Sequence, residues 1–303
     1  MTEQRLCWIV AVLAALSAGG VQAQDLEPRL YTSAPTGLNF LALGYSSSQG
    51  GVLFDPSVPL ENADLTVDGP ALAYVRSLGL WNKSAKFDVA LPHACIDGSA
   101  TYAGQIVTRN VCGFADPRIR VSLNFHGAPA LTPREFATFK QDLVIGASVQ
   151  VTAPTGQYDD DRIVNIGTNR WSIKPEIGFS KPLKHIAVEM AAAVTFYGDN
   201  DEFANGEKEQ EPIYSLQGHV VHVFKAGAWL AGDLTHYQGG RSTVAGQTSD
   251  DLQKNRRFGV TLGLPLNPRQ TLRLHASTGV STRTGTDFDT LAIAWQYRWI
   301  KGP

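Results

Sequence analysis

The sequence predicts an all-β protein: a transmembrane antiparallel up-and-down β-barrel of about 12 strands that follows a cleaved signal peptide. Hydrophobic residues alternate with period two in many segments, short and long connections alternate between those segments, and the N-terminus has the pattern of a secretory signal. The most aromatic strand face lies near the C-terminus and carries Leu291, Ile293, Trp295, Tyr297 and Trp299. A strand of about 9–11 residues is long enough to cross a tilted bilayer.

The composition suits a barrel because only alternate residues of its strands meet lipid. Charged residues make up 18% of the 303 residues and hydrophobic residues 43%. The charged share is below the roughly 25% of soluble domains. The net charge of -2 and the lack of basic runs give no basis for a nucleic-acid partner.

The N-terminus predicts export. Arg5 precedes an apolar core at residues 8–16, and Val21-Gln22-Ala23 fits a signal-peptidase site. We therefore expect a signal peptide at residues 1–23, an N-terminal periplasmic segment at 24–36 and an outer-membrane β-barrel at 37–303. The alternative is a retained membrane anchor, but the apolar run is shorter than the roughly 18–20 residues of a spanning helix.

Alternation and turn signals divide the barrel into twelve expected strands. Their expected ranges are 37–48, 70–80, 85–92, 116–127, 142–153, 171–181, 186–197, 213–224, 228–238, 255–264, 271–281 and 288–299. The cleanest alternation lies in 116–127, where Ile119 and Val121 face lipid and Arg118 and Arg120 face inward. The apolar faces are almost free of charge, which suits lipid and would cause a water-soluble sheet to aggregate.

The connections alternate in length, as expected for short periplasmic turns and longer outer loops. The predicted long loops are 49–69, 93–115, 154–170, 198–212 and 239–254, with a brief polar one at 282–287. One connection on the short side, 128–141, is long. Its Leu131, Phe136 and Phe139 suit either an amphipathic helical turn or an irregular loop.

Aromatic residues near the predicted strand ends suggest the girdles of a membrane barrel. This predicted girdle comprises Trp81, Trp171, Tyr197, Tyr214, Phe224, Trp229, Tyr237 and Trp299.

The inward faces carry charge, and a barrel of about twelve strands is wide enough for a narrow channel or a bound solute. The lumen-lining candidates are Arg118, Arg120, Lys174, Glu176, Glu189, His219, Asp233, Arg257, Arg273 and Arg298. His219 is expected opposite Asp233. This pair would either orient a solute and respond to pH or satisfy itself structurally. The sequence leaves open whether the basic residues line a path for anions or pair with the acidic residues and plug the barrel.

Cys95 and Cys112 form an even pair in an exported chain, so we expect a disulfide between them. It would close a loop of roughly 17 residues and stabilise the fold by about 3 kcal/mol in the chain-entropy model. The alternative is two unpaired thiols.

The outer loops contain acidic runs such as 159–161 and 250–251. Their oxygens suit divalent cations that bridge lipopolysaccharide, or they are simply solvated. The sequence has neither a His-Glu-x-x-His motif nor a Gly-x-Ser-x-Gly elbow, so we predict no catalytic residue, no metal site and no cofactor.

Four segments resemble a known family: 151–158 (VTAPTGQY), 165–171 (NIGTNRW), 277–288 (STGVSTRTGTDF) and 295–299 (WQYRW). They are similar to the MetA-pathway of phenol degradation family, also described as SphA-like outer-membrane proteins, over nearly the whole mature chain. The resemblance implies an outer-membrane barrel tied to uptake of apolar small molecules, aromatic or lipid-like. It offers no agreed functional residues to carry over.

These observations together predict a monomeric channel or transporter in a Gram-negative outer membrane, for uptake of small hydrophobic or aromatic compounds. Its expected partners are the lipid bilayer with lipopolysaccharide and a small apolar solute. Two alternatives remain: an outer-membrane hydrolase of lipids or peptides, and a structural or adhesive barrel with a plugged lumen.

Overall fold

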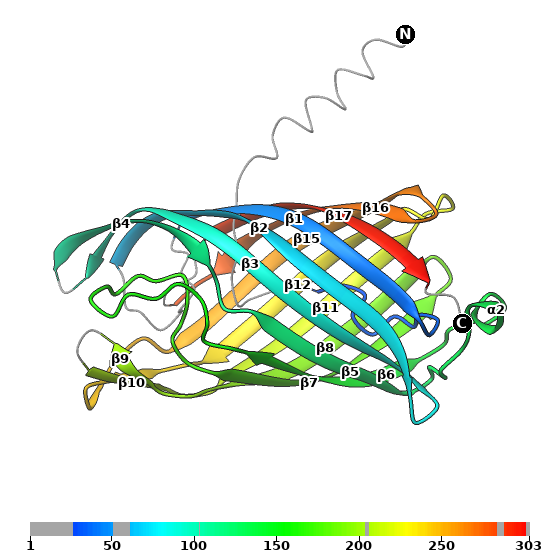
Figure 1. Cartoon of the computed structure of the whole chain (residues 1–303), viewed down its shortest axis with the longest axis horizontal. Coiled ribbons are helices and arrows are strands. Elements are labelled where there is room, and N and C mark those ends of the chain that lie inside the picture. Colours follow the sequence, from blue (N-terminus) through cyan, green and yellow to red (C-terminus); the bar gives the residue numbers. More distant parts are fainter. Residues whose placement is uncertain (1–26, 51–60, 103, 204–205, 284–287, 301–303) are drawn as a thin grey trace, which may run out of the picture.

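A computed structural model describes residues 27–50, 61–102, 104–203, 206–283 and 288–300, and it contains a closed antiparallel barrel of twelve strands (Figure 1). The predicted fold class is therefore confirmed. The predicted signal peptide at 1–23 lies outside the described residues. The barrel strands are β1 (Leu38–Gly50), β2 (Glu61–Leu80), β3 (Lys83–Tyr102), β5 (Arg118–His126), β6 (Val144–Thr152), β7 (Ser172–Leu183), β8 (Ile186–Tyr197), β11 (Ile213–Val223), β12 (Trp229–Gly239), β15 (Gln253–Asn267), β16 (Gln270–Ser281) and β17 (Phe288–Ile300).

The sheet closes because β1 pairs with both β2 and β17. Leu43, for example, lies between Leu72 and Trp295. Closure leaves no sheet edge in the wall, so each wall strand can satisfy its backbone groups without water. Within the part of the chain that the structure describes, no helix is long and apolar enough to cross a membrane.

The predicted loop at 93–115 is wrong. β3 continues to Tyr102 and turns back as β4 (Gln105–Phe114), so that a hairpin extends beyond the barrel wall. The first half of β3 pairs with β5 and the second half with β4. Alternation does continue there, since Ala94, Ile96 and Ala100 are buried on the inner face, but small and polar neighbours conceal it.

The predicted disulfide is present. Cys95 and Cys112 are directly opposite each other in the β3–β4 ladder, and the two sulfur atoms are bonded.

A second sheet lies among the long outer connections, where we predicted only loops. Its order is β14 (Gln247–Thr248), β13 (Ser242–Val244), β10 (Gly206–Gln210) and β9 (Asn200–Phe203). These segments are short and polar, so they carry no local strand signal. They form because two connections that are distant in sequence pair with each other, β10 with β13.

The predicted inside–outside parity holds for β5. Val121 is 48% exposed on the outer face, and the neighbouring Ser122 is buried. At the end of β17, the rings of Trp295, Tyr297 and Trp299 stack in succession, with centroids 6.2 and 5.8 Å apart.

Three members of the predicted aromatic girdle are on the wrong side. Trp229 and Tyr237 are each 4% exposed and share the inward parity of Asp233, and Tyr197 lies beneath the guanidinium of Arg170. Proximity to a strand end does not determine the face, because successive side chains point to opposite faces.

The 128–141 connection contains a helical turn, α2 (Pro133–Phe136), at the short-turn end of the barrel (Figure 1). Thr132 caps it, and Glu135 accepts hydrogen bonds from the Thr132 backbone N–H and hydroxyl, both at 2.8 Å. These bonds lower the pKa of Glu135. The rings of Phe136 and Phe139 are 5.9 Å apart, so the helical alternative for this connection is the one observed.

Candidate functional site

The segment before β1 lies in the lumen. We expected residues 24–36 in the periplasm, but the described part, 27–36, runs from the short-turn rim into the barrel (Figure 1, dark blue). At the rim, the Thr36 N–H donates to Leu131 O at 2.8 Å. Deeper in, Tyr31 and its neighbours contact the wall. We call residues 27–36 the plug.

Tyr31 anchors the plug and is 3% exposed. Its hydroxyl donates to Glu176 Oε1 at 2.9 Å, and Asn124 Nδ2 donates to the Tyr31 carbonyl at 3.3 Å. The ring lies against two glycines that face each other across the β6–β7 ladder, Gly146 and Gly178. A Cβ at Gly146 would lie 2.5 Å from Tyr31 Cδ1, and one at Gly178 would also clash with the ring. Only glycine leaves room for the ring here. Burial and the Glu176 carboxylate raise the pKa of Tyr31.

The plug backbone is held by charged wall residues. The Arg29 N–H donates to Glu189 Oε2 at 2.6 Å, and Lys86 Nζ donates to Leu30 O at 2.6 Å. Glu189 also accepts from Ser180 Oγ at 2.9 Å. Two predicted lumen residues, Glu176 and Glu189, thus bind the chain's own segment.

Glu27 forms an ion pair with Arg120, whose Nε also donates to Asp88 Oδ2 at 3.1 Å. Burial raises the pKa of Glu27, but the cations Arg120, Lys174 and Arg118 outweigh burial and lower it to about 2. The carboxylate is therefore charged at neutral pH, and it contributes to docking of the plug.

Little space remains beside the plug. The cavity between it and the wall measures about 10 Å³ and is lined by Glu27, Tyr31, Glu189 and His219, among others. A cavity of about 10–15 Å³ is the least that holds one water molecule. The plug therefore leaves room for about one water molecule in this cavity.

His219 and Asp233 meet as predicted: Nδ1 of His219 is 2.7 Å from Oδ1 of Asp233, and both side chains are buried. The Thr261 hydroxyl donates to Asp233 Oδ2 at 3.1 Å and is 2.9 Å from Nδ1 of His275. A hydroxyl has a single proton to donate, so His275 Nδ1 is the donor toward Thr261. The pair is thus part of a hydrogen-bonded row across four adjacent strands, β11, β12, β15 and β16.

The remaining lumen candidates have structural partners. Lys174 Nζ is 3.5 Å from Glu176 Oε2, and the Arg273 guanidinium lies 5.5 Å from the ring centroid of Trp229. Arg298 is at the short-turn rim, where its Nε donates to Pro268 O at 2.8 Å. Arg118 is half-buried beside Arg120 on β5.

Arg257 is fully buried near the outer end of the barrel. It donates to Phe288 O and to the Ser277 hydroxyl, both at 3.0 Å, and its guanidinium lies 3.7 Å from the Phe288 ring centroid. The Arg257 guanidinium therefore links β15 to β16 and β17, and its charge is not available to a solute in the lumen.

An apolar cluster occupies the outer half of the barrel. It joins inward residues of β2 and β3 with residues of the β4–β5 and β6–β7 connections, of β9 and of β17: Leu65, Val67, Ala94, Ile96, Ala115, Val164, Ile166, Phe203 and Phe288. The connection that supplies Val164 and Ile166 therefore folds inward.

Asp116 fixes this inward loop. Its carboxylate accepts from the Gly156 N–H and the Thr168 N–H, both at 2.8 Å, and from the Thr168 hydroxyl at 2.7 Å. A Cβ at Gly167 would lie 2.8 Å from the Gly156 carbonyl carbon. The carboxylate of Asp116 thus holds together two segments of this loop, 154–156 (Pro-Thr-Gly) and 165–168 (Asn-Ile-Gly-Thr).

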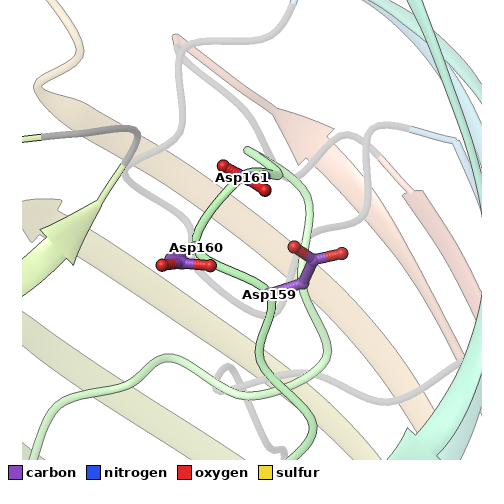
Figure 2. A group of neighbouring side chains, drawn as sticks. All are labelled: Asp159, Asp160 and Asp161. Carbon is purple, nitrogen blue, oxygen red and sulfur yellow. The ribbon is translucent and has the colours of Figure 1, made fainter.

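The acidic run 159–161 follows a turn of the same loop (Figure 2). One oxygen of each carboxylate lies within 4.8 Å of the others. Asp159 is paired with Arg109 at 3.4 Å and with Arg162 at 3.9 Å. Two of the three carboxylates, Asp160 and Asp161, are exposed. The run is therefore compatible with an ordinary solvated loop as well as with a cation site.

Sequence reasoning missed the plug, because nothing local marks residues 27–36 as buried. One signal was available: Gly146 and Gly178 both fall on inward parity in neighbouring strands, and a glycine in a strand often marks a close approach. No comparable signal in the sequence indicated that Tyr31 is the residue that lies against these two glycines.

Solved structures share this fold. An outer-membrane channel from Pseudomonas putida F1 superposes with a TM-score of 0.74 at 21% identity, over 91% of this chain and 100% of that one. The β domain of the Bordetella autotransporter BrkA gives a TM-score of 0.52 at 12% identity, over 87% and 100%. These likenesses show the fold. A closed β-barrel with an apolar exterior is of the outer-membrane type, so the barrel lies in the outer membrane of a Gram-negative bacterium.

No curated protein is significantly similar to the chain in sequence. A family model described as "Putative MetA-pathway of phenol degradation" matches residues 47–297, and the chain therefore belongs to that family.

Proposed function

We propose that this protein is a monomeric outer-membrane channel through which small hydrophobic or aromatic compounds enter the cell. The proposal includes cleavage after Ala23 and contact of the barrel with lipid and lipopolysaccharide. The proposal is supported by the nature of the chain segments that fill the lumen. The twelve wall strands leave space that is occupied by a terminal segment and an inward loop, both held by non-covalent contacts. Such fillings can move without breaking the wall.

The apolar cluster in the outer half supports the solute class. The buried cluster includes Leu65, Ile166 and Phe288, so a solute that passes once the inward loop moves is in contact with apolar groups, which favour an apolar body over a sugar.

The test is uptake by whole cells, because lipopolysaccharide hinders apolar solutes whereas a plain phospholipid bilayer does not. Cells with and without the protein are compared for uptake of labelled toluene, phenol and sucrose. Faster uptake of the two aromatic compounds, with unchanged sucrose uptake, is expected. Equal uptake by both strains, with correctly assembled barrel, would refute the proposal.

A structural barrel with a permanently plugged lumen is the second candidate, and the small residual cavity favours it. It predicts neither solute uptake nor conductance in planar bilayers, for the wild type and for a variant with the plug displaced. Conductance after displacement would exclude it.

The hydrolase alternative has weaker support. His219, Asp233 and Thr261 are hydrogen-bonded to one another, but all three are buried in the plugged lumen, where lipids and peptides have no access. Hydrolysis by the purified protein that His219→Ala abolishes would revive this alternative.

A further inference from the structure

We propose that the slot around Tyr31 is a binding site for a small neutral solute with an aromatic ring and a hydroxyl group, and that the plug occupies this site as an internal competitor. The inference rests on the proposed channel function and names its solute class more narrowly.

The slot is shaped for the group that fills it. The Tyr31 side chain is a phenol with a para-alkyl substituent, held flat against Gly146 and Gly178. At the end of the slot, Glu176 Oε1 accepts a hydrogen bond from the Tyr31 hydroxyl at 2.9 Å. A free phenol of the same size would find the same ring surface and the same acceptor once the plug withdraws.

The charges around the slot select a neutral donor. An ionised Glu176 only accepts hydrogen bonds, so it disfavours a carboxylate ligand and requires a donor. Lys174 lies 3.5 Å from Glu176 and balances its charge, which reduces the advantage of a cationic amine. A hydroxyl provides the donor without adding charge.

The plug is suited to competition because it is tethered and belongs to no strand of the wall. Gly37 connects it to β1, where the Gly37 N–H donates to Ser77 O at 3.1 Å. A tethered group acts at high effective concentration, so the free solute must exceed that competition before the plug leaves. Solute arrival and plug release would then be a single equilibrium.

Release has a natural reporter in Arg29, after which trypsin cleaves when the plug is free. The wild-type protein in detergent is treated with trypsin, and a new N-terminus at Leu30 is quantified by mass spectrometry. p-Cresol should accelerate this cleavage saturably. Toluene lacks the hydroxyl and 4-methylbenzoate carries a charge, so neither should do so. Equal effects of all three compounds, or no effect of p-cresol, would overturn the proposal.

Two variants separate a solute site from a structural anchor. Tyr31→Phe removes the hydrogen bond to Glu176 and should lower the half-maximal p-cresol concentration by about tenfold or more, since bonds to charged groups are strong. An unchanged concentration contradicts the competition model. Gly146→Ala should release the plug without solute and abolish the response to p-cresol.

Gly44→Ala is the matched control. This glycine also faces the lumen, but its added Cβ would meet Ala294 Cβ at an ordinary 3.5 Å, so this variant should behave as the wild type. Persistent stimulation of Gly146→Ala by p-cresol would place the solute elsewhere. Cellular uptake of phenol without any effect of p-cresol on cleavage would leave the channel standing and refute only the slot.

Discussion

At the residue scale, the lipid face of β5 rests on single side chains such as Val121, which lies between Phe87 and Val149 of the neighbouring strands. Val121→Arg should destabilise the assembled barrel by about 2–4 kcal/mol at mid-membrane depth, because a guanidinium replaces an apolar group in hydrocarbon. Urea unfolding in lipid vesicles measures the change, with Val121→Leu as the control. If the arginine variant were as stable as the parent and Ser122→Arg were not, the parity of β5 would be reversed.

Glu27 gives a second prediction at this scale. Its pKa in the docked plug, about 2, lies below the ordinary 4.5, so the charged form favours docking. The contribution is complete above pH 4.5 and is lost as the pH falls toward 2. At pH 7, Glu27→Gln should therefore speed hydrogen exchange of the plug amides. The difference from the wild type should narrow below pH 4.5. A constant difference across this range would contradict the role of this ionisation.

At the element scale, the disulfide holds the β3–β4 hairpin, which projects beyond the closed ring. Replacing both cysteines with serine should destabilise this hairpin by about 3 kcal/mol in the chain-entropy model. Proteases should then cut within 93–114, while global unfolding changes little, because the first half of β3 still pairs with β5. Cleavage confined to the barrel turns in both proteins would show that strand pairing alone holds the hairpin.

The inward loop offers another test at this scale. Asp116→Ala removes the acceptor of three hydrogen bonds from Gly156 and Thr168. It should destabilise the loop by at least about 1.5–3 kcal/mol, the range for one bond to a charged group. Hydrogen exchange of residues 156–168 should rise, whereas Asp160→Ala, at an exposed carboxylate, should leave it unchanged. Equal exchange in both variants would mean that apolar contacts hold the loop.

At the scale of the whole molecule, two fillings lie in series along the lumen: the plug toward the short turns and the apolar cluster toward the outer loops. Resistances in series add, so removing one filling leaves the other limiting. Gly146→Ala and Asp116→Ala should each raise planar-bilayer conductance only slightly, and the double variant should raise it by more than the two single effects combined. A full opening by either single variant would show that one filling alone closes the channel.

Much of the wall was predictable from sequence. All twelve strands were expected, and β8 was expected within its observed bounds of Ile186–Tyr197. Such segments are predictable because lipid imposes alternation on each strand separately. The second sheet was missed for the converse reason: β10 and β13 have little pattern of their own and exist through mutual pairing.

The sequence by itself determined the wall and its two faces, because these follow from periodicity over about ten residues. It also predicted the pairing of Cys95 with Cys112, because an exported chain reaches an oxidising compartment. Only the tertiary structure decided what fills the lumen. Tyr31 and Glu176, which are hydrogen-bonded in the lumen, are 145 residues apart in the sequence. No local pattern records such a contact, because it depends on how the ring of strands closes around the segment.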